Sequence, residues 1–406
     1  MGRRIGTGIG ANTGMKSPQF GNARQVEIYS RGAPGAVPVS VRRLERQARR
    51  AMTPAARDYI FGAAGGEATL RANRAALERW RIVPRMLRDV SQRDLRLDLF
   101  GTTLPAPVLL APIGVQELVH AQGDLPAAKA AAARGVPFVL STVSSRTIEE
   151  VAAAGGARWF QLYWGKNPEL TQSLVQRAAA AGYGALVVTL DTPMLGWRER
   201  DLDRGDLPFL RGAGLANFFS DPVFCSALAC PPAEDGAAAV ALWSRVFSNP
   251  ALTWKDLAWL RAQTRLPIVL KGIQHPDDAR QALDCGADGI IVSNHGGRQV
   301  DGAIGSLDAL PGIARAVESR VPILFDSGIR RGADAFKALA LGARAVLLGR
   351  LFLYGLALDG EAGVGAVLDN FVADFDLTLA LSGYSTPGEL TSGEEPALCP
   401  MRRNEP

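Results

Sequence analysis

Two side chains able to do chemistry, His295 and Arg298, stand three positions apart just after a short apolar run, Ile290–Val292. The run has the composition of a buried parallel strand, and two glycines then take the chain out of it. Arginine is well shaped to hold a carboxylate, because its planar fork matches both oxygens. Histidine is the side chain best able to move a proton near neutral pH. The pair therefore predicts an enzyme that anchors an acid and removes a proton from it, although a surface ion pair and a core histidine would explain the same residues.

The elements that must position these residues recur along the chain. Eight strand-like runs follow one another, namely Val108–Pro112, Phe138–Thr142, Trp159–Tyr163, Leu186–Asp191, Ile268–Gly272, Ile290–His295, Ile323–Gly328 and Val346–Arg350. Helical segments separate most of them, at 124–134, 147–154, 168–181, 255–264, 276–285, 307–319 and 332–341. Strand and helix alternating to eight predict the α/β class and a (β/α)8 TIM barrel. An open doubly wound sheet is the alternative, and the lack of a GxGxxG motif after the first strand favours the barrel.

Three other segments stand outside this repeat. Residues 38–80 predict an N-terminal helical segment, with Pro54 in a first turn. Leu95–Leu104 alternates apolar and polar residues around a glycine, which predicts a hairpin. Residues from about 192 to 254 follow the fourth strand with little periodicity. Because so long a connection at the carboxyl end of a barrel strand is usually functional, we expect a lid, with parts that lack order.

Charge is spread unevenly. The net charge is +5, yet residues 1–50 hold ten basic and two acidic residues, whereas the remainder holds 35 basic and 38 acidic residues. The body is therefore not basic, and no nucleic-acid partner is expected. Residues 1–22, rich in Gly, Asn, Ser and Thr, predict a disordered basic arm, which leaves residues 23–406 as a single domain.

Composition also sets limits on location and metals. The chain has no apolar run of about 18 residues, and no apolar stretch follows Arg3 and Arg4, so we expect neither a membrane span nor a signal peptide. A cytoplasmic protein is the resulting expectation. The four cysteines show no metal-ligand spacing, and Cys225 and Cys230 are expected to stay reduced, so no metal site is predicted.

Polar residues gather where the strands of such a barrel would end. They are Gln161, Tyr163, Thr189, Asp191, Lys271, Ser293, Asp326, Gly349 and Arg350. Packing alone is a poor explanation, because barrel enzymes keep their active sites at the carboxyl ends of the strands. The connections Asp326–Gly332 and Gly349–Arg350 match the phosphate site that often follows strands seven and eight, since glycine lets backbone N–H groups approach a phosphate and arginine supplies charge.

The segments Ser293–Gln299, Gln161–Tyr163, Lys271–Gly272 and Asp326–Arg330 resemble the FMN-dependent L-2-hydroxy acid oxidase and dehydrogenase family, over about residues 40 to 390. The resemblance implies FMN as the cofactor, and a small L-2-hydroxy acid and O2 as reactants. It also implies a homo-oligomer, either a tetramer or an octamer.

Individual roles follow from the resemblance. His295 would be the base, Asp191 would stabilise its imidazolium form, and Tyr163 would hydrogen-bond near the substrate hydroxyl or carboxylate. Lys271 would lie by flavin N1 and the C2 carbonyl, where an ammonium stabilises developing charge. The substrate carboxylate would be held by Arg198, Arg298 and Tyr59. The flavin ring would contact Ser141, Gln161, Thr189 and Ser293, and on its N5 side Pro112, Ile113 and Gly114. The remaining cofactor contacts would come from Asp326, Ser327, Gly328, Arg330, Gly349 and Arg350.

Finer features resemble the lactate 2-monooxygenase subgroup. They are Ala111–Val115, Gly196–Leu202, Pro208–Gly212, Asp221–Phe224 and Lys271–Asp278. The first prediction is therefore a lactate 2-monooxygenase. Such an enzyme keeps the keto acid bound while peroxide forms, so that L-lactate and O2 give acetate, CO2 and water. Val300–Asp301 instead follows the oxidases, so an oxidase that releases 2-keto acid and H2O2 stays open, as does a dehydrogenase linked to a quinone or cytochrome.

Gly114 bears on this choice, because many oxidases of the family carry alanine there. A glycine would leave a small space beside the flavin, which would favour retention of the keto acid. Backbone freedom is an equally good explanation of the glycine.

Overall fold

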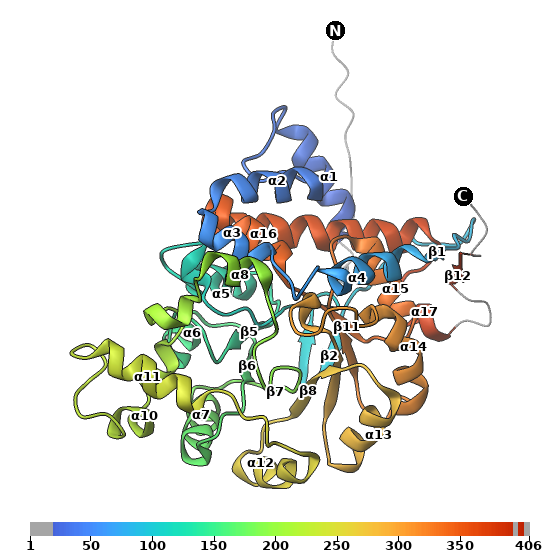
Figure 1. Ribbon diagram of the computed structural model, residues 1–406. Helices are drawn as coiled ribbons and strands as arrows, with labels where there is room; N and C mark the ends of the chain where they lie inside the picture. Colours follow the sequence, from blue (N-terminus) through green and yellow to red (C-terminus); the bar gives the residue numbers. More distant parts are fainter. Residues whose placement is uncertain (1–18, 393–396, 402–406) are drawn as a thin grey trace.

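Eight parallel strands close into a barrel in the computed structural model, which describes residues 19–392 and 397–401 (Figure 1). The strands are β4 (Val108–Leu110), β5 (Phe138–Ser141), β6 (Arg158–Leu162), β7 (Leu186–Thr189), β8 (Ile268–Ile273), β9 (Gly289–Val292), β10 (Ile323–Phe325) and β11 (Ala345–Leu348). They pair in chain order, and β11 closes onto β4. The predicted TIM barrel and its eight strands are confirmed.

Helices surround the barrel where the sequence predicts them. They are α5 (Leu125–Ala132), α6 (Ile148–Ala152), α7 (Pro168–Ala180), α12 (Leu257–Gln263), α13 (Pro276–Asp284), α14 (Ser306–Val317) and α15 (Gly332–Ala340). Local signals start several of them. Thr147 and Glu150 form a capping box at α6, and Asn167 caps α7 ahead of a proline at its first position.

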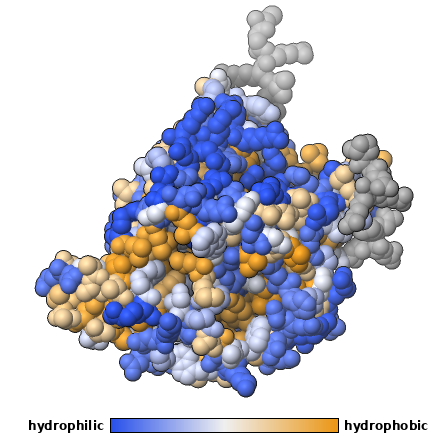
Figure 2. Space-filling view, in the orientation of Figure 1, coloured by the Kyte–Doolittle hydropathy of each residue, from blue (hydrophilic) through white to orange (hydrophobic). Residues whose placement is uncertain are grey.

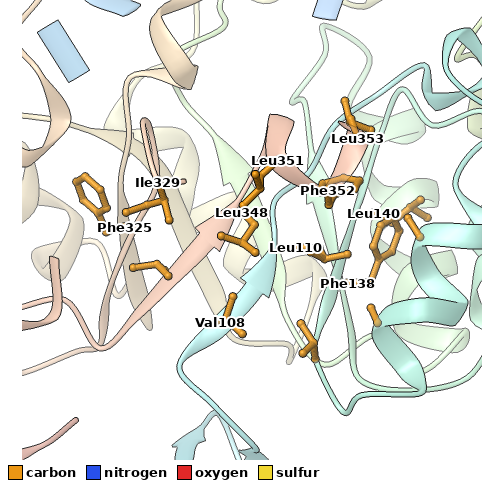
Figure 3. Packing of buried hydrophobic residues seen from close by; sticks show 14 of the residues in the cluster. Val108, Leu110, Phe138, Leu140, Phe325, Ile329, Leu348, Leu351, Phe352 and Leu353 are labelled. Atoms are coloured by element: carbon orange, nitrogen blue, oxygen red, sulfur yellow. The ribbon is translucent and has the colours of Figure 1, made fainter. Parts of the chain in front are cut away.

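The strands are apolar on both faces because each face is covered. Val108 and Leu110 of β4 pack with Phe138, Leu140 and the helices outside the barrel (Figure 3). The intervening Leu109 belongs to a second buried cluster, whose members include Val139, Trp159, Val187 and Ile291. The hairpin β2 (Leu97–Leu99) and β3 (Thr102–Leu104), which the sequence predicts, packs into that second cluster. The interior of the barrel is thus a filled core, and the hollow needed for chemistry must lie beyond it.

Helices also precede the barrel, as predicted for residues 38–80. They are α1 (Phe20–Ser30), α2 (Val41–Ala51), α3 (Pro54–Phe61) and α4 (Ala68–Glu78). The expected disordered arm needs a correction at its end, because α1 begins at Phe20, whereas residues 1–18 lie outside the described residues. The Gly21 N–H donates to the buried carboxylate of Asp376 at 2.8 Å, and Arg93 pairs with the same carboxylate. This buried ion pair fixes a segment that composition alone would leave free.

The longest helix, α16 (Arg350–Leu381), is one that the strand–helix pattern did not predict. It changes direction at Asp359 and Gly360, and it packs against α1, α2, α5 and α15 (Figure 1). Within the described ranges it is the one helix long and apolar enough to cross a membrane, and most of its apolar stretch is buried inside the protein. The same composition is typical of a core helix, so the absence of a membrane partner remains a prediction.

Three short elements lie outside the barrel and its helices. Strand β1 (Trp80–Ile82) pairs antiparallel with β12 (Leu398–Pro400), and α17 (Glu389–Ser392) lies before β12 in the sequence. The four cysteines are all free thiols, as expected.

Residues 192–254, called the lid segment below, differ from the expectation of partial disorder. They form α8 (Glu199–Arg204), η2 (Pro208–Arg211), α9 (Ala216–Phe219), α10 (Pro222–Ser226) and α11 (Gly236–Val246), followed by η3 (Trp254–Asp256). Except for α11, which has 11 residues, these helices have only three to six residues and are too short to show a period in the sequence. They are held by a cluster of aromatic rings with centroids 4.7–6.5 Å apart, made of Phe209, Phe218, Trp243 and Phe247.

A buried amide joins the lid segment to the barrel. The Asn217 side chain accepts from the Ile148 N–H at 2.8 Å, and it donates to the carbonyls of Ser141 and Thr142 and to the Ser144 hydroxyl. The outer surface of the lid segment is apolar, with Met194, Trp197, Leu202 and Leu210 exposed. Figure 2 shows this surface over α8 and α11, in contrast with the hydrophilic surface over α1 and α2.

Candidate active site

Strand register brings polar side chains together at the carboxyl end of the barrel. Ser141 of β5 lies opposite Gln161 of β6, and Thr189 of β7 lies opposite Lys271 of β8. The Ser141 hydroxyl donates to Gln161 Oε1 at 3.0 Å, and Gln161 Nε2 donates to Thr189 Oγ1 at 3.0 Å. Three neighbouring strands thus end in one hydrogen-bonded row. Because the row is buried, its side chains are held in fixed orientations.

A cavity of about 1300 Å³, its open mouth included, lies over these strand ends. Most of the predicted site residues line it, namely Tyr59, Pro112, Ile113, Gly114, Tyr163, Arg198, Lys271, His295, Arg298, Asp326, Ser327, Gly328, Arg330, Gly349 and Arg350. The other predicted residues, Ser141, Gln161, Thr189, Asp191 and Ser293, lie behind this lining and bond to one another or to it. Residues more than 200 positions apart in the chain therefore meet in one cavity.

The central pair is His295 and Asp191. His295 Nδ1 lies 2.8 Å from Asp191 Oδ1, and Thr192 Oγ1 donates to the same oxygen at 3.1 Å. On the other side of the ring, His295 Nε2 lies 3.4 Å from the Tyr163 hydroxyl. A carboxylate beside Nδ1 favours the tautomer with its proton on Nδ1, which leaves the Nε2 lone pair directed toward the cavity.

Burial sets the charge states of this pair. Burial lowers the pKa of His295, against the opposing effect of Asp191, so the imidazole is neutral at pH 7. Burial alone would raise the pKa of Asp191, but His295 and Lys271 outweigh it and the pKa is lowered. A neutral histidine next to an ionised carboxylate is the form required of a general base.

Two buried arginines lie on the same side of the cavity. Arg298 Nη1 donates to the carbonyls of Tyr59 at 2.5 Å and Gly62 at 2.9 Å, and its guanidinium lies 4.8 Å from the centre of the Tyr59 ring. Arg198 donates through Nε to the Arg298 carbonyl and through Nη2 to Gln299 Oε1. Burial first, and Arg198 second, lower the pKa of Arg298 to about 9. Two desolvated cations with free N–H groups make a site for an anion.

Lys271 places a third positive charge at the floor of the cavity. Its ammonium donates to Ser293 Oγ at 2.8 Å and lies 3.3 Å from Asp326 Oδ2. The side chain is almost fully buried, at 4% exposure, so its charge acts at short range through little water. This position suits an ammonium that stabilises negative charge formed in the cavity.

Two further arginines that line the cavity, Arg350 and Arg330, use their donors differently. Arg350 directs three of its donors to the carbonyls of Ile60, Gly62 and Gly296, at 2.8, 2.9 and 3.1 Å. Arg330 is partly exposed, and its Nη1 lies 3.7 Å from Glu45. The predicted phosphate contact of Arg350 is therefore limited to the two N–H groups that it has left.

Backbone groups are the better donors around Arg350. Helix α16 starts at Arg350 and has no side-chain cap. The Phe352 N–H donates to the Gly349 carbonyl at 3.1 Å, which leaves the N–H groups of Arg350 and Leu351 as the donors of the first turn. They face the cavity together with Gly328, whose φ of +103° favours glycine. A helix start of this kind attracts a phosphate through its N–H groups and its dipole.

Comparison with known proteins places this geometry in a family. Residues 48–394 match the model of the FMN-dependent dehydrogenases. The chain belongs to this family. It is 49% identical over 330 residues to L-lactate oxidase of Lysinibacillus sphaericus, covering 81% of this chain and 85% of that protein. An FMN-dependent alpha-hydroxy acid dehydrogenase of Penicillium citrinum is 46% identical over 348 residues, covering 84% and 87%. A crystal structure of mandelate oxidase superposes with a TM-score of 0.78 at 41% identity, covering 87% of this chain and 97% of that one.

Family membership makes the protein an FMN-dependent 2-hydroxy acid oxidoreductase, and the cavity fits FMN. The residues expected to hold the flavin and those expected to hold the substrate carboxylate line the same cavity. Lys271 matches the charge that develops on a reduced flavin ring, and the start of α16 with Gly328 matches a phosphate. We expect the ring to lie at the Lys271 end and the phosphate at the Arg350 end.

The structure adds lining residues that the sequence motifs did not indicate. They are Leu70, Arg74, Val143, Thr192, Leu195, Phe209, Phe247, Leu351, Leu353 and Tyr354. Most lie in helices or in the lid segment, where no strand pattern marks them. Phe209 is the exception, because it lies in Pro208–Gly212, a segment whose sequence resembles the lactate 2-monooxygenase subgroup.

Gly114 does not leave the space that its sequence position suggested. A methyl group on Gly114 would come within 2.5 Å of Val143 Cγ2 and 2.6 Å of the Val143 carbonyl oxygen. The side-chain position is thus already filled by Val143, and the proposed gap beside the flavin is wrong. Glycine is needed here because two backbone segments approach closely, tied by the bond from the Val115 N–H to the same carbonyl.

Proposed function

We propose that the protein oxidises a small L-2-hydroxy acid, L-lactate first among the candidates, to the 2-keto acid, with O2 as the electron acceptor. The observation that carries the proposal is a neutral, largely buried histidine, paired with a carboxylate and sharing a cavity with two arginines. The relatives named above support lactate and mandelate as the substrates to compare.

FMN, when bound, would accept a hydride equivalent, that is, the two electrons and one of the two hydrogens that leave the substrate. Arg198 and Arg298 hold the substrate carboxylate, which fixes the α-carbon relative to His295. His295 Nε2 takes a proton from the substrate, and Asp191 stabilises the imidazolium that results. Tyr163, whose pKa burial raises, stays protonated and donates a hydrogen bond to a substrate oxygen. Lys271 stabilises negative charge that builds on the side of the cavity that it faces.

The fate of the keto acid divides two candidates. An oxidase releases it together with H2O2, whereas a monooxygenase retains it until peroxide decarboxylates it. The lid segment favours retention, because Leu195, Phe209 and Phe247 line the cavity from above the strand ends and the segment is anchored to the barrel. Against this, Gly114 adds no space, and the relatives include an L-lactate oxidase at 49% identity. We therefore place the oxidase ahead of the lactate 2-monooxygenase that the sequence predicted first.

Two measurements test the proposal. Stopped-flow reduction of the flavin with L-lactate, glycolate and L-mandelate should show saturable bleaching, fastest with the preferred acid. Aerobic turnover should then give stoichiometric H2O2 and keto acid for an oxidase, or acetate and CO2 for a monooxygenase. No reduction by any L-2-hydroxy acid would refute the proposal, and reduction that O2 does not reverse would indicate a quinone- or cytochrome-linked dehydrogenase.

We further propose a cytoplasmic homo-oligomer, a tetramer or an octamer. The apolar surface of the lid segment, with Trp197 at 70% exposure, is consistent with a subunit contact. Light scattering coupled to gel filtration would test the oligomeric state. Fractionation of the source cells would test the cytoplasmic location.

A further inference from the structure

The turn that carries His295 has a strained backbone. His295 has a φ of +58°, and Gly296 after it has a φ of +65°. Residues other than glycine rarely adopt this left-handed region, and at active sites they persist only where the surroundings hold them. The contacts of the turn should therefore show what holds His295.

The principal contact comes from the next strand, through Ser327. Its hydroxyl oxygen accepts the N–H of Asn294 at 3.2 Å and the N–H of Gly296 at 3.0 Å, the two residues that flank His295. The same hydroxyl donates to Asp326 Oδ1 at 2.8 Å. Ser327 is buried, and its three hydrogen bonds use the full capacity of one hydroxyl group in this geometry.

Ser327 is itself strained, with a φ of +80°. Glycine would adopt this conformation freely, so the serine side chain must offset the strain by what it does. The side chain lines the cavity, but its oxygen is already engaged with the turn of His295 and with Asp326. Both features point away from a simple cofactor contact, which is the role that the resemblance alone gives to Ser327.

We propose that Ser327 is a positioning residue for His295. The Ser327 hydroxyl binds the backbone on both sides of His295 and connects this turn to Asp326 and, through it, to Lys271. The chain of contacts runs from Lys271 through Asp326 Oδ2 and Oδ1 to the Ser327 hydroxyl, and from there to the backbone beside His295. A second route runs from Lys271 to Ser293 Oγ, which accepts the His295 N–H at 3.0 Å. The base and the buried ammonium are thereby held in one fixed relation, on strands β8, β9 and β10.

Removal of the hydroxyl has a specific consequence. The buried N–H groups of Asn294 and Gly296 would lose their acceptor, and the turn would move or admit water to satisfy them. Either change displaces His295 from the substrate while its pair with Asp191 can persist. Because positional errors of about 1 Å can cost roughly a hundredfold in rate, the chemical step should suffer more than binding.

Two substitutions separate the hydroxyl from the strain. Ser327→Ala removes the hydroxyl and keeps the strained backbone, whereas Ser327→Gly removes the hydroxyl and also the strain. If the hydroxyl positions His295, both variants should reduce flavin roughly ten- to a hundredfold more slowly than the wild type, with KM changed by less than about threefold and FMN retained. Ser327→Gly should melt at a higher temperature than Ser327→Ala.

Ser319 provides a matched control. It is an exposed serine with a φ of +60°, located between α14 and β10 and away from the cavity. Ser319→Gly and Ser319→Ala should reproduce the difference in melting temperature without a change in flavin reduction. The two Ser319 variants show how much of a change in melting temperature or flavin reduction at Ser327 comes from backbone strain alone.

The kinetic part of this test rests on the proposed function. A measurement of the His295 ring itself does not, because it needs no turnover. The chain has three histidines, so ring signals of labelled histidine can be assigned with His120→Gln and His275→Gln. In the FMN-loaded protein, both Ser327 variants should shift the His295 ring signals, while the other two histidines stay unchanged. Unchanged His295 signals together with wild-type rates in Ser327→Gly would overturn the proposal, and an inactive wild type would instead refute the proposed function.

Discussion

The two ends of the cavity handle negative charge by different means. At the substrate end, Arg198 is buried and the adjacent Arg298 is partly buried, and no carboxylate of the described residues makes a direct ion pair with either. At the phosphate end, Arg350 is occupied by three carbonyls and Arg330 lies near Glu45, so backbone N–H groups are the main donors. One end thus relies on side-chain charge and the other on the main chain.

One helix connects the two ends. The last carbonyls of α3 have no partner within the helix, and they accept from Arg298 at Tyr59 and from Arg350 at Ile60. Both arginines also donate to the Gly62 carbonyl. A helix carboxyl end carries partial negative charge, which suits two guanidinium groups. An arginine in this cavity can bind an anion or can hold the protein backbone in place. The number of its N–H groups that are not bonded to protein carbonyls decides which of the two it does.

Replacement of the base at the substrate end should have the largest effect. His295→Ala removes the Nε2 acceptor, and loss of a general base typically costs roughly 10²–10⁴-fold in rate. Flavin reduction followed by stopped flow should fall by this factor, while the flavin spectrum shows that FMN stays bound. Near-native reduction would mean that the proton leaves by another route.

Arg298→Lys should have the next largest effect, although the charge is kept. Lysine lacks the planar fork, so it cannot serve the Tyr59 and Gly62 carbonyls and the substrate carboxylate together. We expect kcat/KM to fall roughly ten- to a hundredfold, mainly through KM, as for loss of about 1.4–3 kcal/mol of binding. Arg96→Lys, at a surface pair with Asp94, is the control and should change nothing.

The dependence of kcat/KM on pH should reflect the lowered pKa of His295. The imidazole must be neutral to accept a proton, and burial lowers its pKa from the ordinary value of 6.5. The acid limb of kcat/KM should therefore lie below pH 6.5 and fall about tenfold per unit beneath it. Tyr163 adds no alkaline limb near neutrality, because burial raises its pKa. A limb above pH 7 would show that Asp191 outweighs burial in the free enzyme.

The strand ends were predictable for a physical reason. In a parallel barrel the carboxyl ends of all strands meet at one face, so residues such as Thr189 and Lys271 converge once the strands are recognised. The specific pairing of Asp191 with His295 came from family resemblance, and the structure supplies the distance that supports it.

Other features depend on tertiary contacts that no local pattern shows. The lid segment folds through contacts of Phe209 with Trp243 and Phe247, and Phe209 lies more than 30 positions before these two rings in the sequence. Gly114 could be understood only when Val143 was seen against it. Ser327 was predicted as a cofactor contact from the family resemblance alone, whereas its hydroxyl is bonded to the turn that carries His295.

The smallest effect is expected at the phosphate end, from Arg330→Gln. The side chain is partly exposed and lies near Glu45, so water and salt screen its charge, and surface ion pairs contribute about 0–1 kcal/mol. The dissociation constant of FMN should therefore rise by less than about fivefold, and raised salt should shrink the difference between variant and wild type. Fluorescence titration of the apoprotein with FMN measures both quantities. A loss of a hundredfold or more would show that Arg330 is a direct phosphate ligand, and the two ends of the cavity would then use arginine in the same way.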